Sequence, residues 1–163
     1  MHQIEDLIEV KTIINGVMVH RQVPSRMHLG DFLRAEMGLN GLHLGCEHGV
    51  CGACTILVDG LLVRSCLMLA AQIDGCKVQT IEGVVESGEA QMMVSAFQNK
   101  NAAQCGFCSP AMILTTLEII KKPHRPTREQ IREAISGNYC RCTGYQAIVD
   151  AVEEVLDQKE SKL

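Results

Sequence analysis

The spacing of the cysteines limits what this chain can fold into more than any other feature. The 163 residues include nine cysteines, and eight of these fall into two closely spaced sets. An odd number of cysteines, an N-terminus without a secretion signal and gaps of only two residues favour metal ligation in a reducing cytoplasm over disulfides. We therefore expect a cytoplasmic metal-binding protein.

The first cysteine set has the spacing C-x4-C-x2-C, and eleven residues separate it from a fourth cysteine. This spacing is typical of plant-type 2Fe-2S ferredoxins. Gly45, Gly49 and Gly52 stand beside the cysteines, where a missing Cβ permits positive φ and close approach of backbone N–H groups to cluster sulfur. The expected ligands are Cys46, Cys51, Cys54 and Cys66.

Two other metal sites are compatible with parts of this set. A structural zinc site also uses four cysteines, but zinc modules favour paired C-x2-C motifs over a C-x4-C-x2-C loop with a distant fourth ligand. His48 lies inside the loop, yet a Rieske centre needs two histidines in place of two cysteines. We expect His48 to be a loop side chain.

The second cysteine set is a C-x2-C followed, after thirty-one residues, by a C-x-C. Ser109-Pro110 resembles an N-cap followed by proline at the first helical position, and Thr143 resembles a second cap. Helix N-termini favour thiolate over thiol and stabilise an anionic cluster. The spacing by itself also suits zinc. This set consists of Cys105, Cys108, Cys140 and Cys142.

The first half, residues 7–81, has the pattern of strands with one helix. Asn15-Gly16 and Asp59-Gly60 each lie between apolar stretches, the strongest local signal for two-residue hairpins. Apolar residues at helical spacing between the hairpins predict one helix, which Gly38 ends. The inward residues of that helix are Leu29, Phe32, Leu33 and Met37.

The second half has the pattern of four helices. The polar segment 82–89 has no clear periodicity and is interpreted as the boundary, which divides the chain into residues 1–83 and 84–163. Residues 111–120 are apolar on nearly every face and are expected to be buried. Thr127 with Gln130 and Thr143 with Gln146 fit the capping-box pattern. Gly137 is predicted to end the third helix.

Charge and composition exclude several functions. The net charge of −4 gives no basic surface for nucleic acid. No apolar run approaches the roughly 20 residues that a transmembrane helix needs. No Ser/His/Asp set, paired carboxylates or phosphate-binding loop occurs, so we expect no catalytic residue for substrate in this chain. Cys76 lies outside both sets and is interpreted as a small apolar residue that is buried or partly buried.

Over residues 8–158 the sequence resembles the iron–sulfur subunits of the xanthine oxidase, or molybdenum hydroxylase, family. The resemblance implies an α+β chain: a β-grasp 2Fe-2S ferredoxin domain followed by a four-helix bundle with a second 2Fe-2S cluster. The segments that carry it are Gly45-Cys46-Glu47, Cys51-Gly52-Ala53-Cys54-Thr55, Gln104-Cys105-Gly106-Phe107-Cys108 and Gly137-Asn138-Tyr139-Cys140-Arg141-Cys142-Thr143-Gly144-Tyr145.

The resemblance also implies partners. These are a large subunit with the molybdenum pterin cofactor, usually a medium subunit with FAD, and assembly as a dimer of heterotrimers. By the family pattern, electrons pass singly from molybdenum through the two clusters to FAD or another acceptor. The C-terminal cluster is the nearer to molybdenum, and Gln104 and Cys142 match the positions that contact the pterin. The alternative to a pterin contact is a structural role, in which Gln104 is a polar residue beside a helix that makes a local hydrogen bond.

Two further hypotheses compete with this electron-transfer subunit. A zinc-stabilised interaction module would use the cysteines for structure alone, and it would be colourless. A free ferredoxin would leave the second cysteine set without a purpose. A visible spectrum with iron, zinc and sulfide assays distinguishes the zinc module from a red-brown protein with two 2Fe-2S clusters.

Overall fold

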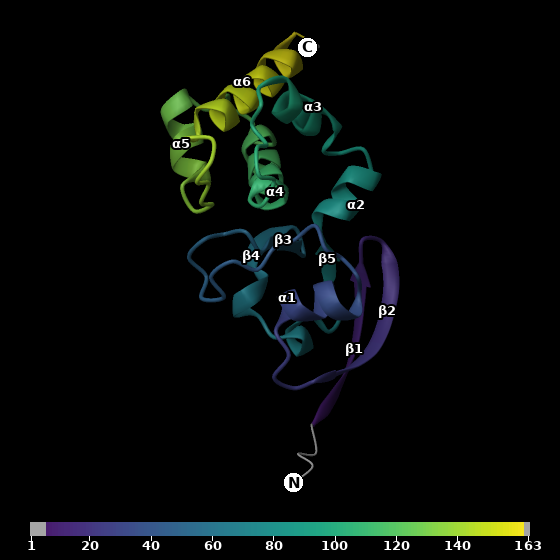
Figure 1. Ribbon diagram of the computed structural model, residues 1–163. Helices are drawn as coiled ribbons and strands as arrows, with labels where there is room; N and C mark the ends of the chain where they lie inside the picture. The colour runs from purple at the N-terminus through teal and green to yellow at the C-terminus, as the bar shows by residue number, and fades with distance from the viewer. Residues whose placement is uncertain (1–5, 162–163) are drawn as a thin grey trace.

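The computed structural model describes residues 6–161 as a sheet-containing half and a helical half (Figure 1). No helix in this range is long and apolar enough to cross a membrane. The strands are β1 (Leu7–Ile14), β2 (Val17–Pro24), β3 (Thr55–Val58), β4 (Leu61–Arg64) and β5 (Lys77–Gln79). The helices are α1 (Leu29–Asp31), α2 (Ile81–Glu86), α3 (Gln91–Asn99), α4 (Ser109–Ile120), α5 (Arg128–Ile135) and α6 (Gln146–Glu160).

The five strands form one mixed sheet in the order β2-β1-β5-β3-β4. Strands β1 and β5 are parallel, whereas the other neighbours are antiparallel. Both predicted hairpins are confirmed. Asn15 and Gly16 have φ of 49° and 81°, and Asp59 and Gly60 have φ of 49° and 79°, as a two-residue turn requires. The chain is therefore α+β, as expected.

The predicted helix of the first half runs from Leu29 to Glu36, with a π-helical turn, Phe32–Glu36, after α1. Leu29, Phe32 and Leu33 are fully buried against the sheet, whereas Met37 is only half-buried. Gly38 follows the helix with φ of 69°, so its role as the terminating residue is confirmed.

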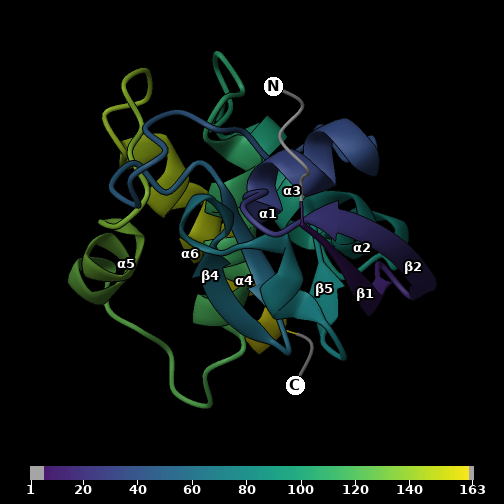
Figure 2. The ribbon, with the colours of Figure 1, turned by 90° about the horizontal axis from the view of Figure 1, so that it is seen from below.

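Strand β3 is buried on both faces because the sheet lies between α1 and α4. Ile56 and Val58 belong to the core around α1, whereas Leu57 belongs to the core of the helical half. Helix α4 packs on β3 and also on α2, α3, α5 and α6, which makes it the central helix (Figure 2). The expected burial of residues 111–120 is confirmed, with only Glu118 and Ile120 half-exposed.

The helices of the second half begin differently from the prediction at three points. Helix α2 occupies most of the segment that was interpreted as the boundary because it has no clear periodicity, and the Glu82 carboxylate accepts a hydrogen bond from the Gly41 N–H at 2.7 Å. This contact with the first half stabilises a helix that local periodicity does not reveal. The division of the chain after residue 83 falls inside α2 and stays a prediction.

The two caps beside the second cysteine set were predicted wrongly. Cys108, not Ser109, is the N-cap of α4, and Pro110 follows within the first turn. Helix α6 begins at Gln146 after Tyr145, which has φ of 67°, so Thr143 and Gln146 do not form a capping box. The Thr143 hydroxyl instead accepts a hydrogen bond from the Tyr145 N–H at 3.1 Å. The Thr143 side chain therefore binds the N-cap residue of α6 instead of an N–H group in the first turn of the helix.

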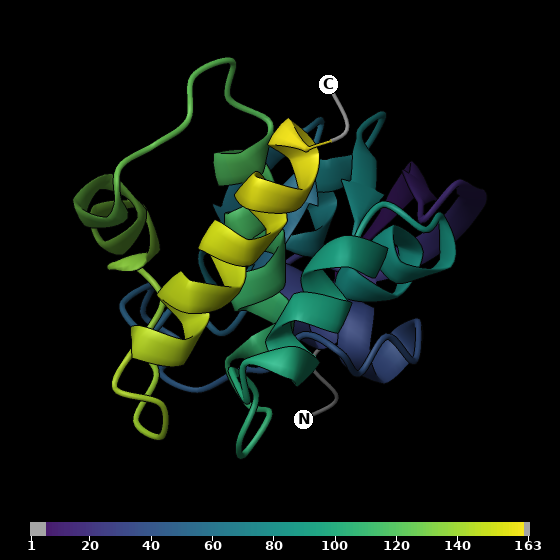
Figure 3. The same cartoon turned by 90° about the horizontal axis from the view of Figure 1, so that it is seen from above.

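Helices α3 and α6 lie side by side across the outer face of α4, as seen from above (Figure 3). Helix α5 is joined to α6 through Arg128, whose guanidinium pairs with Asp150 at 2.6 Å and with Glu153, both on α6. The predicted capping box at its start is confirmed: the Gln130 N–H donates to the Thr127 hydroxyl at 3.2 Å, and the Thr127 N–H donates to Gln130 Oε1 at 2.8 Å.

Replacing Thr127 by alanine removes the oxygen that accepts from the Gln130 N–H. We expect Thr127→Ala to lower the free energy of unfolding by about 1 kcal/mol, the usual effect of losing an N-cap. Thr127→Ser keeps the cap and is the control. Denaturant unfolding of the cluster-loaded chain measures both, and equal stability of the two variants would contradict the role of the cap.

Candidate metal centres

The β3–β4 hairpin brings the first cysteine set together. Cys54 immediately precedes β3, and Cys66 lies in a 3-10 turn, Ser65–Leu67, directly after β4. The Ser65 N–H and hydroxyl both donate to the Cys54 carbonyl, at 3.2 and 2.9 Å. Cys54 and Cys66 are buried, whereas Cys46 and Cys51 are half-buried in the loop that precedes the hairpin. The hairpin thus supplies the inner pair of thiols and the loop the outer pair.

The loop around Cys46 turns backbone N–H groups toward sulfur. Gly49 and Gly52 have φ of 83° and 74°, the conformations for which glycine was expected. The Cys51 N–H donates to Cys46 Sγ at 3.3 Å. Hydrogen bonds from the backbone of Cys51 and His48 lower the pKa of the Cys46 thiol to about 6. This loop therefore stabilises negative charge on sulfur.

The inner thiol of Cys66 has a raised pKa, in contrast to the lowered pKa of Cys46. Burial, followed by the neighbouring Cys54 thiol, raises the pKa of Cys66 to about 11. A thiolate at this position needs a positive partner to offset the loss of solvation. Iron bound to the four thiols would supply that charge.

The second cysteine set lies at the ends of two loops in the helical half. Cys108 is buried at the start of α4, and Cys140 is half-buried in the loop before α6. Burial, followed by the contact with Cys140, raises the pKa of Cys108 to about 12. Burial opposes ionisation of Cys140 too, but the Thr143 hydroxyl, 3.2 Å from its sulfur, lowers the Cys140 pKa. At Cys108, burial thus outweighs the expected effect of the helix N-terminus.

Cys105 and Cys142 are the exposed members of the second set. The neighbouring Cys105 thiol raises the pKa of Cys142. Gln104 is also exposed and forms no hydrogen bond with any residue in the range 6–161. The local hydrogen bond of the structural interpretation is therefore not seen for Gln104, which is exposed like Cys105 and Cys142.

Each set of four thiols is arranged as two contacting pairs. In the first set Cys46 contacts Cys51, and Cys54 contacts Cys66. In the second set Cys108 contacts Cys140, and Cys105 contacts Cys142. Among residues 6–161 no three His, Cys, Asp or Glu side chains converge in a way that would hold a single metal ion. A 2Fe-2S cluster binds two thiolates on each iron, so two pairs of thiols fit it.

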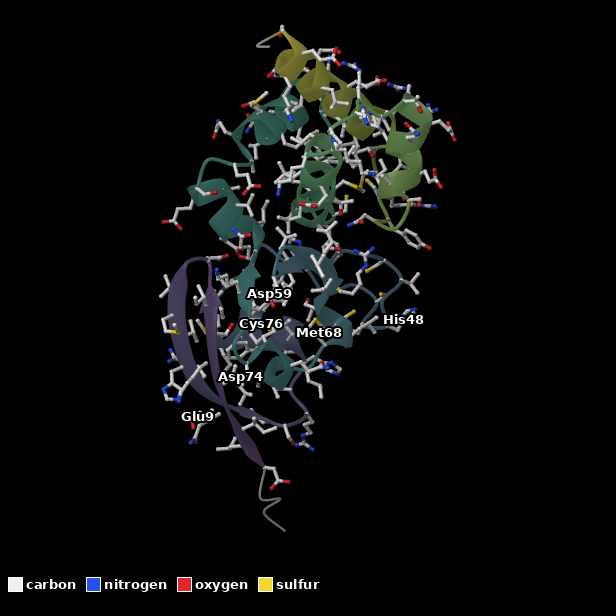
Figure 4. All side chains as sticks on the ribbon, turned by 180° about the vertical axis from the view of Figure 1, so that it is seen from behind. Glu9, His48, Asp59, Met68, Asp74 and Cys76 are labelled. Atoms are coloured by element: carbon white, nitrogen blue, oxygen red, sulfur yellow. The ribbon has the colours of Figure 1, made fainter. Side chains whose placement is uncertain are left out.

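Figure 4 places the remaining cysteine, Cys76, in the sheet-containing half, and the loop histidine, His48, on the first cysteine loop. Burial, followed by the Asp59 and Asp74 carboxylates, raises the pKa of Cys76, which is half-buried as expected. His48 is exposed on the first cysteine loop, where its Nδ1–H donates to the Cys46 carbonyl at 2.5 Å. This is the loop position that the sequence indicated.

The two cysteine loops touch each other, which the sequence did not predict. The Tyr139 N–H donates to the Cys51 carbonyl at 2.8 Å. The His43 and Phe107 rings stack with centroids 4.7 Å apart, and His43 Nδ1–H donates to the Phe107 carbonyl at 2.9 Å. No periodicity or spacing signals either contact, because each joins residues more than 60 positions apart.

Two family profiles match the chain along most of its length. The profile of the 2Fe-2S iron-sulfur cluster binding domain matches residues 12–75, and that of the 2Fe-2S binding domain matches residues 80–153. The molecule is thus an iron–sulfur protein with two 2Fe-2S domains.

Individual relatives extend over nearly the whole chain. The nicotine 6-hydroxylase small subunit of Paenarthrobacter nicotinovorans is 46% identical and covers 96% of this chain and 94% of its own length. The xanthine dehydrogenase iron-sulfur-binding subunit of Escherichia coli O157:H7 is 40% identical, covering 96% and 98%. A chain of quinoline 2-oxidoreductase from Pseudomonas putida 86 superimposes with a TM-score of 0.85 at 40% identity, covering 96% of each chain.

The chain belongs to the family of small iron–sulfur subunits of the molybdenum hydroxylases, the xanthine oxidase family. It is an electron-transfer component of an oxidoreductase and carries two 2Fe-2S domains. The alternative of a zinc-stabilised interaction module has no support among these relatives.

A side chain at Gly52 would separate the two cysteine loops. A Cβ there would lie 2.4 Å from the Gly137 carbonyl oxygen, whereas a Cβ at Gly60, which has a similar φ, meets nothing within 4 Å. We expect Gly60→Ala to cost about 1 kcal/mol for its left-handed conformation. Gly52→Ala should cost a further ~1–3 kcal/mol, because backbone must move to admit the methyl group.

The free energy of unfolding of the two cluster-loaded variants tests this difference. Gly60→Ala is the matched control, since it carries the same conformational strain without the clash. Equal destabilisation by the two substitutions would show that the loops do not pack against each other at Gly52.

Proposed function

We propose that this chain relays electrons one at a time from the molybdenum pterin cofactor of a large subunit to FAD, or another acceptor, on a partner. The observation that carries the proposal is the 2.8 Å hydrogen bond from the Tyr139 N–H to the Cys51 carbonyl. Cys51 belongs to the first thiol set, and Tyr139 adjoins Cys140 of the second. The two sets are therefore linked by a short path through the backbone of one chain.

We assign four ligands to each cluster. The thiol pairs, the N–H groups around Cys46 and the depressed pKa of that thiol support the assignment. When bound, a 2Fe-2S cluster takes up and releases single electrons. The proposed ligands are Cys46, Cys51, Cys54 and Cys66 for the first cluster, and Cys105, Cys108, Cys140 and Cys142 for the second.

The exposure of the thiols indicates the direction of the relay. Cys105 and Cys142 are exposed, so one side of the second set can meet a partner without rearrangement. Gln104 lies beside them with its amide free to bind a group of that partner. We therefore propose that the second cluster faces the molybdenum pterin cofactor, with Gln104 and Cys142 in contact with the pterin.

The surface around the two cysteine loops supports assembly with partners. Val50 and Phe107 are each 46% exposed, Tyr139 is 56% exposed and Leu67 is 62% exposed. Large apolar residues grouped at functional loops are typical of protein interfaces. We propose a large molybdenum subunit and a medium FAD subunit as the partners, assembled as a dimer of heterotrimers.

Three finer features belong to the same proposal. The first half, residues 1–83, is proposed to be a β-grasp ferredoxin domain, supported by the mixed sheet and α1. The second half, residues 84–163, is proposed to work as a four-helix bundle of α3 to α6, supported by their shared core. A cytoplasmic location is supported by the nine free cysteines.

Removing one proposed ligand tests whether each half of the chain binds its own cluster. We expect native protein to give two distinct EPR signals on reduction, and Cys51→Ser to lose the signal of the first cluster while keeping the second. Substrate should then reduce the remaining cluster, yet electrons should not reach the acceptor. Cys76→Ser, outside both sets, is the control. If both signals vanish while the protein stays folded, the division of ligands is wrong.

The proposed pterin contact of Gln104 is tested by Gln104→Ala in the complete complex. Because Gln104 is not a cluster ligand, iron content should be unchanged. Loss of one buried hydrogen bond at the interface costs about 1 to 3 kcal/mol, so reduction of the clusters by substrate should slow only partially. Single-turnover reduction and molybdenum content are the measurements. If neither changes, Gln104 does not contact the pterin.

A further inference from the structure

A buried polar cluster lies between the two halves of the molecule, directly behind the cysteine loops. Its centre is Asn138, only 2% exposed, which comes from the segment before Cys140. Asn138 Nδ2 donates to the Gly52 carbonyl at 3.1 Å and lies 3.5 Å from the Thr55 hydroxyl. These hydrogen bonds connect one side chain of the helical half to the loop and strand that begin at the first thiol set.

The other end of the same amide binds within the helical half. The Thr115 hydroxyl of α4 lies 3.2 Å from Asn138 Oδ1 and 2.9 Å from the Ala111 carbonyl, so its proton is shared between these two oxygens. Thr115 is itself buried. Asn138 therefore uses its donor toward one half and its acceptor toward the other, which neither an aliphatic residue nor an aspartate could do.

A second side chain spans the same contact from the opposite direction. Arg64, at the end of β4, donates from Nη2 to the Gly137 carbonyl at 2.7 Å and from Nη1 to the Thr55 hydroxyl. Consecutive residues of the helical half, Gly137 and Asn138, are thus each hydrogen-bonded to the sheet-containing half. With Thr55 as a common partner, the two side chains form one connected network.

This network encloses a place where backbone meets backbone. A Cβ at Gly52 would lie 2.4 Å from the Gly137 oxygen and 3.0 Å from Asn138 Cα, so no side chain fits between the loops. The neighbours of these residues are also in contact, because Tyr139, which follows Asn138, donates its N–H to the carbonyl of Cys51, which precedes Gly52. One residue further along lies Cys140. The network therefore holds main-chain atoms of two proposed ligand loops at a defined separation.

We propose that Asn138 and Arg64 are positioning residues that set the separation of the two clusters. The inference rests on the proposed relay, since it describes how this chain fixes the distance between its two redox centres. The rate of electron transfer falls steeply with distance, and groups that orient metal ligands from behind are worth about 10–100-fold in function. Neither Asn138 nor Arg64 is one of the proposed cluster ligands.

Asn138→Ala and Arg64→Met, each in the complete complex with its partner subunits, test the inference. Iron content and both EPR signals should be retained in both variants. The magnetic coupling between the two reduced clusters should weaken, and electron transfer from the second cluster to the first should slow about tenfold. The Tyr139 amide should exchange with deuterium at least about tenfold faster. Arg64→Lys, which keeps a donor for the Gly137 carbonyl, should recover most of the lost rate.

Two variants serve as matched controls. Asn99→Ala removes an asparagine of the same half whose side chain, among residues 6–161, hydrogen-bonds to Glu154 alone, at 3.0 Å. Arg132→Met removes an arginine whose partners, Glu129 and Gln146, both lie in the helical half. Neither control should change coupling, transfer rate or exchange at Tyr139.

The outcomes separate this inference from the proposed function. Wild-type coupling and transfer rate in both Asn138→Ala and Arg64→Met would overturn the positioning role alone. So would loss of the second cluster in Asn138→Ala with an unchanged Arg64→Met, because Asn138 would then support cluster binding instead. If Asn138→Ala fails to fold, Arg64→Met decides. A wild-type complex whose clusters substrate cannot reduce would overturn the proposed function and, with it, this inference.

Discussion

The close approach of two loop backbones, at Gly52 on one side and Gly137 and Asn138 on the other, is the constraint on which the arrangement of this molecule depends. Only a residue without Cβ can occupy position 52, because the opposing carbonyl oxygen would lie 2.4 Å from the added carbon. This contact joins the loop of the first thiol set to the loop of the second. The two redox sites therefore belong to one continuous structure rather than to two domains that are connected only by a linker.

The burial of β3 on both faces follows from the same contact. A sheet that faced solvent on one side would show polar residues at alternate positions. Strand β3 is buried at all four positions because α4 covers the face that α1 does not. Thr55 starts this strand and also binds Asn138 and Arg64, so the packing of the sheet on α4 and the polar network stabilise the same geometry.

The two thiol sets differ in exposure, and this difference suits a relay. The thiols of the first set are buried (Cys54 and Cys66) or half-buried (Cys46 and Cys51), whereas the second set has two exposed thiols, Cys105 and Cys142. Burial raises the pKa of Cys66 and Cys108, so these thiols depend on bound metal for their negative charge. Hydrogen bonds lower the pKa of Cys46 and Cys140, so each set combines one stabilised and one desolvated sulfur.

The sequence by itself determined the local features of this protein. The Asn15-Gly16 and Asp59-Gly60 turns, the Gly38 helix end and the Thr127 cap are set by nearest neighbours along the chain, and the cysteine spacing indicated two metal sites for the same reason. Tertiary structure decided the rest. The helix at α2 and the contacts made by His43, Phe107 and Asn138 depend on residues far away in the chain. No local pattern encodes them, because their hydrogen bonds form only once the two halves have packed together.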